Sequence, residues 1–249
     1  MFYEPGKTDH GLPRDPFKAC VVPRPIGWIS TLSSTGTPNL APYSQFNNLT
    51  FDPPYIMFSA NQTPTAAQKD TVRNVETTGV FCWNLATYDL REAVNKTAQG
   101  FGEDVDEFEV AELEKVDSRM SFVGVGKERK AVPMVKKSPI KFECTYYSTL
   151  KLPGSPPMGA CDVVIGRVIG IHIDEDVLTD GKIDIKKTVP IARLGYFEYT
   201  AVREVFEMKI PGMDGLLELG LEGSGSKIRD QLSNKDAEGG AEPEEKKPR

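Results

Sequence analysis

Residues 24–60 read RPIGWISTLSSTGTPNLAPYSQFNNLTFDPPYIMFSA, and this stretch carries most of the information about the fold. Residues 28–32 alternate large and small side chains around β-branched residues, as a half-buried strand does. The Ser-Thr-Gly at 34–36 supplies turn chemistry, because glycine tolerates the positive φ of a tight reversal. The chain then returns as a second strand at 39–43. Pro42 lacks a backbone donor, so it predicts a sheet edge or a bulge there.

The residues after Pro42 predict a polar loop followed by another strand. We expect residues 43–48 (YSQFNN) to leave the sheet where the proline interrupts it. Such a loop can offer Ser and Asn side chains, and free backbone N–H groups, to a heteroaromatic ring. Asp-Pro-Pro at 52–54 predicts a turn, and the apolar run 55–60 has the length of a buried strand.

A helix is predicted to start near Lys69, because Val72 and Val75 lie three residues apart on one face. Lys69, Thr71 and Arg73 then lie at the helix N-terminus, where unpaired N–H groups and the helix dipole favour an anion. Two basic residues there are best explained by a phosphate between them. The alternative is an ordinary N-cap with a solvated lysine.

Two blocks of sequence closely resemble the flavin reductase-like FMN-binding split-barrel family. The first block consists of Arg24-Pro25-Ile26, the Ser30-Thr31 pair, Gly36 with Asn39, Ala41-Pro42-Tyr43-Ser44, Phe46-Asn47, Asp52-Pro53-Pro54, and Lys69-Asp70-Thr71 with Asn74. The second block, residues 161–173 (CDVVIGRVIGIHI) and 190–196 (PIARLGY), is similar to the family's closing strands and its arginine-leucine-glycine signature. The resemblance extends over about residues 23–199.

This resemblance implies a mainly β fold with short helices, namely a six-stranded antiparallel Greek-key split barrel. It also implies a homodimer that holds FMN in a groove near the subunit interface. By resemblance, the ring or the ribityl chain would be contacted by Ser30, Thr31, Ser44 and Asn47, and the phosphate by Lys69 and Thr71. These contacts would be flanked by Trp28 and Arg193. A further contact to the phosphate or the ring would come from Arg24.

The resemblance further implies an FMN-binding oxidoreductase, most simply an NAD(P)H:flavin reductase with a nicotinamide electron donor. A non-catalytic FMN electron carrier that receives electrons from a protein partner, and a flavin-dependent oxygenase, stay open as alternatives. The residues predict no catalytic acid–base set, because His10 and His172 lie far apart and no nucleophile elbow occurs. No His/Cys cluster predicts a metal site either. We expect His172, between two isoleucines, to be structural.

Composition indicates one globular domain with extended ends. The 249 residues carry a formal charge of −6, which argues against nucleic acid or an anionic membrane as a partner. No apolar run approaches the ~18 residues of a membrane span, and the first ten residues lack a signal-peptide core, so we expect a cytoplasmic protein. The cysteines are expected to be small buried hydrophobes rather than disulfides, namely Cys20, Cys82, Cys144 and Cys161.

The predicted organisation is an N-terminal extension at 1–22, the barrel domain at 23–210, and a largely disordered polar tail at 211–249. Residues 118–131 are interpreted as an insertion, and residues 151–157 as a Pro-rich interruption between consecutive strands. Further elements are predicted as strands at 80–85 and 140–150, a helix at 89–98 and a short surface helix within 103–115.

Overall fold

The computed structural model describes residues 1–63, 65–157 and 159–212. It divides into two units, Met1–Val205 and Phe206–Arg249. The helices and strands described below all lie in the first unit. Apart from residues 211 and 212, the polar tail predicted at 211–249 lies outside the described residues.

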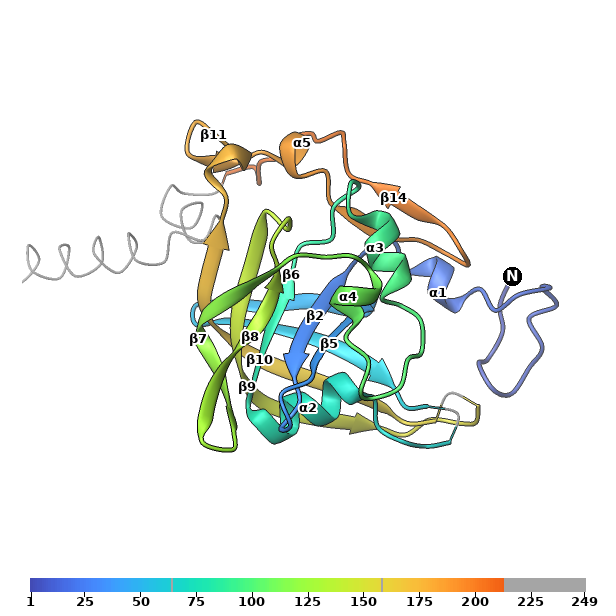
Figure 1. Cartoon of the computed structure of the whole chain (residues 1–249). Helices are drawn as coiled ribbons and strands as arrows, with labels where there is room; N and C mark the ends of the chain where they lie inside the picture. Colours follow the sequence, from blue (N-terminus) through green and yellow to red (C-terminus); the bar gives the residue numbers. More distant parts are fainter. Residues whose placement is uncertain (64, 158, 213–249) are drawn as a thin grey trace, which may run out of the picture. The chain divides into compact units, whose positions relative to one another are not determined.

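The first unit is built around one antiparallel sheet of seven strands in the order β3-β2-β6-β9-β10-β5-β4 (Figure 1). The strands are β2 (Gly27–Leu32), β3 (Pro38–Tyr43), β4 (Phe46–Phe51), β5 (Pro54–Asn61), β6 (Val80–Asn84), β9 (Ile140–Leu152) and β10 (Cys161–Ile173). The two edge strands, β3 and β4, are consecutive in the chain, with only Ser44 and Gln45 between them. The predicted mainly β split-barrel class is therefore confirmed, and Pro42 lies on an edge strand as expected.

The strand count differs from the predicted six because the predicted loop at 43–48 was wrong. Tyr43 still belongs to β3, and β4 begins at Phe46, which pairs with Phe58 of β5. The Phe46 ring stacks on the Trp83 ring, with the ring centroids 5.4 Å apart. This apolar contact explains why a stretch of mostly polar residues forms a strand. Only Ser44 and Gln45 form the bend, which we call the 44–45 bend.

The core fills the inside of the sheet and the face covered by helix α2 (Asp70–Thr78). Val72 and Val75 are fully buried, which confirms the predicted apolar face of this helix. Strand packing is so close at Gly166 that an added Cβ would lie 2.3 Å from Phe81 Cζ. Glycine is therefore required where β10 passes over this ring.

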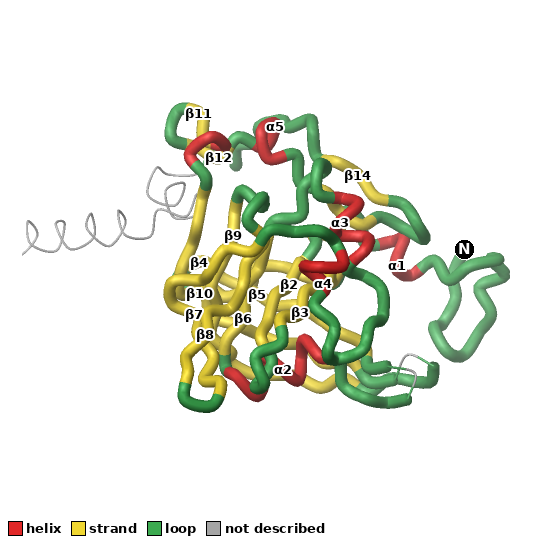
Figure 2. Tube along the Cα trace, viewed as in Figure 1, coloured by secondary structure: helices red, strands yellow, loops and turns green. Residues whose placement is uncertain are grey.

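Smaller elements surround the main sheet (Figure 2). They comprise α1 (Phe17–Cys20), α3 (Arg91–Lys96), α4 (Glu107–Val110), α5 (Ile185–Thr188), the 3-10 turn η1 (Glu175–Val177), the three-stranded sheet of β1 (Arg24–Pro25), β13 (Ile191–Arg193) and β14 (Tyr199–Ala201), and the pairs β7 (Lys115–Val125) with β8 (Glu128–Val135) and β11 (Leu178–Thr179) with β12 (Lys182–Ile183).

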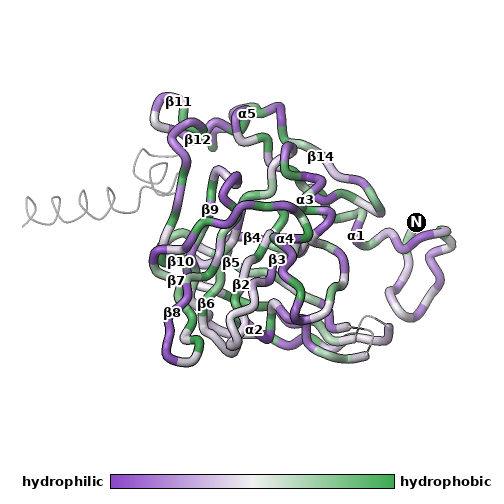
Figure 3. The backbone as a smooth tube through the Cα atoms, in the orientation of Figure 1, coloured by the Kyte–Doolittle hydropathy of each residue, from purple (hydrophilic) through white to green (hydrophobic). Residues whose placement is uncertain are grey.

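The segment 118–131, interpreted from sequence as a loop-like insertion, is part of the β7–β8 hairpin. The turn between these strands is hydrophilic (Figure 3). Because its sequence is basic and contains glycine, the strands on either side of it were not predicted. The Pro-rich interruption predicted at 151–157 does lie between the consecutive strands β9 and β10, except that Lys151 and Leu152 still belong to β9.

The cysteines are all free thiols. Cys82 and Cys144 are buried and Cys161 is half-buried, but Cys20 is exposed on the short helix α1, so the expectation of a buried side chain was wrong for Cys20. Among the residues that the structure describes, no helix is long and apolar enough to cross a bilayer.

Candidate functional site

The 44–45 bend is fixed at the rim of the barrel by the strands on either side. The N–H of Ser59 on β5 donates to the carbonyl of Gln45 at 2.8 Å. Ser44 is half-buried, and its hydroxyl has no hydrogen-bond partner in the described part of the chain. Asn47 on β4 is exposed, with Oδ1 accepting from the N–H of Asn48 at 3.0 Å. Both side chains are therefore available to a ligand.

The start of helix α2 is held against β2 and β3 by two buried amide side chains. Asn39 Nδ2 donates to Thr71 Oγ1 at 2.9 Å, and Asn74 Nδ2 donates to Thr31 Oγ1 at 3.1 Å. Lys69 is the N-cap residue with an extended backbone, and its side chain makes no cap hydrogen bond. The helix N-terminus therefore has a fixed position, and its first N–H groups are not capped by a side chain.

Tyr43 links the two parts of the site. It is the last residue before the 44–45 bend, and its buried phenol interacts with the Thr71 side chain in the first turn of α2. Burial raises the pKa of the Tyr43 phenol, and the nearby carboxylates of Asp70 and Glu107 raise it further. Tyr43 is thus a neutral phenol, and the bend and the helix start lie one side-chain contact apart.

Of the two basic residues predicted near this helix start, only Lys69 is free. Arg73 is paired with Asp70 at 2.7 Å and with Glu103 at 2.8 Å, so its guanidinium is already neutralised. Lys69 is exposed and has no ion-pair partner among the described residues. The sequence analysis explained two basic residues by a phosphate between them, but the Arg73 guanidinium is already paired with carboxylates. Lys69 alone remains available.

Three of the predicted site residues are fully buried within the protein. Trp28 donates through Nε1 to Thr97 at 2.9 Å, and Ser30 Oγ accepts from Asn84 at 3.2 Å. Thr31 is bound to α2 as described above. Their side chains hold the β2 wall of the barrel, whereas Ser44, Asn47 and Lys69 face outward.

Arg24 and Arg193 lie together on the small sheet of β1, β13 and β14. They are paired residues of β1 and β13. Arg24 donates to the carbonyls of Val21 and Leu194 at 2.7 and 2.9 Å, and Arg193 donates to the carbonyl of Tyr196. Both guanidiniums thus bind backbone carbonyls, and Arg193 also lies 4.5 Å from the Tyr199 ring centroid.

Sequence reasoning missed the role of Tyr43 and the isolation of Asp162 at this end of the barrel. Asp162 is 1% exposed, and neither carboxylate oxygen has a hydrogen-bond partner in the described part of the chain. It pairs with Ala60, the neighbour of Ser59. The sequence contains one sign of this isolation, namely an aspartate within the apolar run CDVVIG.

Residues 19–198 match the family model described as "Flavin reductase like domain". The chain belongs to this family. An uncharacterized protein from Halalkalibacterium halodurans is 34% identical over 77% of this chain and 87% of its own length. Among solved structures, nitrilotriacetate monooxygenase component B from Bacillus cereus is 29% identical, with a TM-score of 0.73 over 84% of this chain and 98% of that one.

The flavin reductase-like fold is also shared by flavoredoxin of Desulfovibrio vulgaris (Miyazaki F). It has a TM-score of 0.63, covers 83% of this chain and 98% of its own, and is 20% identical, which supports the shared fold alone.

Proposed function

We propose that this chain is an FMN-binding oxidoreductase of the cytoplasm that takes electrons from NAD(P)H, in the manner of a flavin reductase. Family membership supports a flavin-related activity. The observation that supports the proposal is the Tyr43–Thr71 interaction, because Tyr43 precedes the accessible polar bend and Thr71 lies in the first turn of the uncapped helix. A phosphate and a ring rich in carbonyls and nitrogens need these two features together.

In this proposal, the phosphate is bound by the Lys69 ammonium and by the first backbone N–H groups of α2. Lysine binds phosphate as a point charge, and the helix dipole adds to the attraction. Thr71 contributes its backbone N–H, because its hydroxyl is occupied by Asn39 and Tyr43. Asp70 and Arg73 neutralise each other and leave Lys69 as the free positive charge.

The ring would lie against the 44–45 bend and the start of β4, where Ser44 and Asn47 offer a hydroxyl and an amide. Trp28, Ser30 and Thr31 support this position from behind by keeping β2 and α2 in register. Bound FMN supplies the hydride-accepting chemistry, and the protein's own residues bind and orient it.

We further propose a homodimer formed through the outer face of β5, β9 and β10. Leu150 is 57% exposed and is paired with Val163, while Ile165 is paired with Met57. Outward apolar residues in neighbouring rows form a patch that a stable partner would cover. Analytical ultracentrifugation should give a dimer for the wild type and a monomer for Leu150→Glu. A monomeric wild type would refute this interface.

The direct test of function is to purify the protein, release its chromophore by heat, and follow NADH and NADPH oxidation with FMN added. We expect FMN in the supernatant and turnover with one of the two donors. FMN retention without turnover would remove the reductase activity. Reduction only by an added protein partner would favour an electron carrier, and oxygen uptake that depends on an organic substrate would favour an oxygenase.

A further inference from the structure

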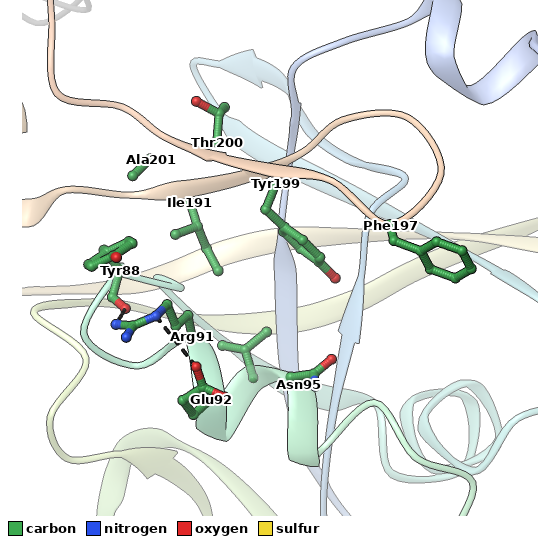
Figure 4. A pocket seen from close by; sticks show the side chains of 10 residues that line it. Tyr88, Arg91, Glu92, Asn95, Ile191, Phe197, Tyr199, Thr200 and Ala201 are labelled. Carbon is green, nitrogen blue, oxygen red and sulfur yellow. Dashed lines mark hydrogen bonds and ion pairs between the residues drawn. The ribbon is translucent and has the colours of Figure 1, made fainter.

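A cavity of about 320 Å³ lies between helix α3 and the β13–β14 hairpin (Figure 4). Its apolar floor consists of Val94 on the helix and Ile191 on the hairpin, which are 2% and 6% exposed. In Figure 4 the side chains of Ile191 and Tyr199 project from the hairpin toward the helix, where Asn95 lies. None of these groups belongs to the flavin site proposed above.

Aromatic side chains surround this cavity and remain open to solvent. Tyr88 is 38% exposed, Tyr199 is 42% exposed and Phe197 is 82% exposed. Aromatic rings left exposed around an apolar floor are suited to stacking on a planar ligand such as a nucleic-acid base. The cavity therefore favours a flat heterocycle.

Two arginine residues lie against the Tyr88 ring, Arg91 in the cavity wall and Arg203 next to it, outside the lining. Arg91 and Arg203 lie 4.1 and 4.6 Å from the Tyr88 centroid. Arg91 is occupied, because it donates to the Tyr88 carbonyl and pairs with Glu92 at 3.5 Å. Arg203 makes no hydrogen bond or ion pair within the described ranges, so its guanidinium can bind a phosphate in bidentate fashion.

Asn95 supplies the polar group that a base would read. Its side-chain amide has no hydrogen-bond partner among the residues that the structure describes. The NH₂ group of an asparagine can donate to N7 of adenine while its carbonyl oxygen accepts from the N6 amino group. An aromatic wall, an amide reader and a free arginine together match the parts of an adenine nucleotide.

The cavity also lies close to the proposed flavin site along the strands. Arg193 at the edge of the hairpin pairs with Arg24, and Gly27, three residues further on, pairs with Tyr43. Three residues of extended chain span roughly 10 Å. A ligand that extends from the cavity along this edge would therefore approach the 44–45 bend.

We propose that this cavity binds the adenine-nucleotide half of the dinucleotide electron donor, with the base between Tyr199 and the α3 surface, Asn95 on its edge and Arg203 on a phosphate. This inference rests on the proposed function for the identity of the donor. The adenine recognition itself rests on the cavity and can be tested without any turnover.

The test is isothermal titration calorimetry of the full chain with ADP-ribose, in the presence and absence of FMN. We expect binding to the wild type and at least tenfold weaker binding to Tyr199→Leu. Asn95→Ala, at an exposed helix position, should abolish the preference for AMP over GMP. The matched control is Phe122→Leu, which removes another arginine-stacked ring, on the β7–β8 hairpin, and should bind ADP-ribose like the wild type.

Absence of ADP-ribose binding to the folded wild type would overturn the site. So would a Tyr199→Leu variant that binds ADP-ribose as tightly as the wild type, together with an Asn95→Ala variant whose preference for AMP over GMP equals that of the wild type. Displacement of ADP-ribose by FMN would also overturn it, since the cavity would then hold the flavin. These results are readable even if the protein proves not to be a reductase, because they require no turnover.

The donor assignment is tested by kinetics. The KM for NADH should rise about tenfold in Tyr199→Leu, whereas the KM for reduced nicotinamide mononucleotide, which lacks the adenine half, should not change. Loss of ADP-ribose binding with an unchanged KM for NADH would overturn the donor assignment and indicate a separate adenine-nucleotide ligand.

Discussion

Glu143 and Asp162 are both 1% exposed carboxylates on the paired strands β9 and β10, but their surroundings differ completely. Glu143 accepts three backbone N–H bonds from residues 119–121, at 2.7, 2.7 and 2.8 Å, and a fourth from His172 Nε2 at 2.7 Å. Asp162 has no hydrogen-bond partner in the described part of the chain. One carboxylate is fully bonded and the other is isolated.

The difference follows their positions. Glu143 ties β9 to the β7–β8 hairpin and to the end of β10, and His172 is bonded there as expected of a structural histidine. Asp162 pairs with Ala60, beside the strand residue that holds the 44–45 bend. Unpaired buried polar groups are rare and call for an explanation. The unpartnered Asp162 carboxylate thus lies at the end where the proposed ligand binds, whereas the Glu143 carboxylate at the other end is fully bonded.

The largest effect on stability is expected from removing the hydrogen bonds of the Glu143 carboxylate. Glu143→Ala leaves the N–H groups of residues 119–121, of which that of Ser121 is buried, and His172 without an acceptor, so we expect the free energy of unfolding in urea to fall by about 3–5 kcal/mol. FMN affinity of the folded protein should not change. Glu109→Ala, an exposed carboxylate on α4, should stay within about 0.5 kcal/mol of the wild type. A loss below 1 kcal/mol for Glu143→Ala would mean that this end contributes little.

The next effect is expected at the ligand end. Lys69→Ala should weaken FMN binding by about 1.5–3 kcal/mol, because a charge-assisted phosphate contact is lost, with no change in stability. Fluorescence titration of FMN measures this, and Lys127→Ala in the β7–β8 turn is the matched control for an exposed lysine. Equal affinity in both variants would refute the assignment of Lys69.

Asp162→Asn tests whether the isolated carboxylate costs stability. Removing a buried, unpaired charge should raise the free energy of unfolding by about 1–2 kcal/mol in the FMN-free protein. Asp117→Asn on the exposed part of β7 is the control. A decrease of more than 1 kcal/mol would show that the carboxylate is paired in solution and would end the contrast with Glu143.

The pH dependence of stability should come from the bonded end. Burial by itself would raise the pKa of Glu143, but the hydrogen bonds from Arg119, His172 and the neighbouring N–H groups lower it overall. Its contribution is therefore present above the unfolded pKa of about 4.3 and is lost as pH falls through the lower folded value. Acid titration of the urea midpoint should show this loss in the wild type, and a profile identical to that of Glu143→Ala would contradict it.

Ser44→Ala should have the smallest effect on affinity, below about 1 kcal/mol, because a neutral hydroxyl contributes one modest hydrogen bond. We expect the reduction potential or absorption spectrum of bound FMN to change instead. Spectroelectrochemistry compares the two proteins, and identical potentials and spectra would indicate that Ser44 does not reach the ring.

The sequence predicted individual strands because their residues alternate clearly and the turns carry Gly and Pro at the reversals, whereas the barrel itself was implied by the family resemblance. The β2–β3 hairpin and helix α2 both occur where residues 28–43 and Lys69 indicated. Strand β4 could not be predicted, since its polar residues face solvent and only Phe46 packs inward. The local sequence pattern of an edge strand is weak, and the pairing of β4 with β5 determines that this stretch forms a strand.

At the proposed site, the exposure of the side chains agrees with the sequence at some positions and differs at others. Ser44, Asn47 and Lys69 are open to a ligand, as their polar and basic character suggested. Burial of Ser30 and Thr31, and the pairing of Arg73 with Glu103, depend on contacts between residues distant in the chain. No local pattern contains such contacts.

The most direct test of the central claim is a crystal structure of the protein with FMN bound. We expect the phosphate to lie within hydrogen-bond distance of Lys69 Nζ and the first N–H groups of α2, with the ring against the 44–45 bend. A flavin bound elsewhere in both subunits, with Lys69 in solvent and the bend uncovered, would contradict it.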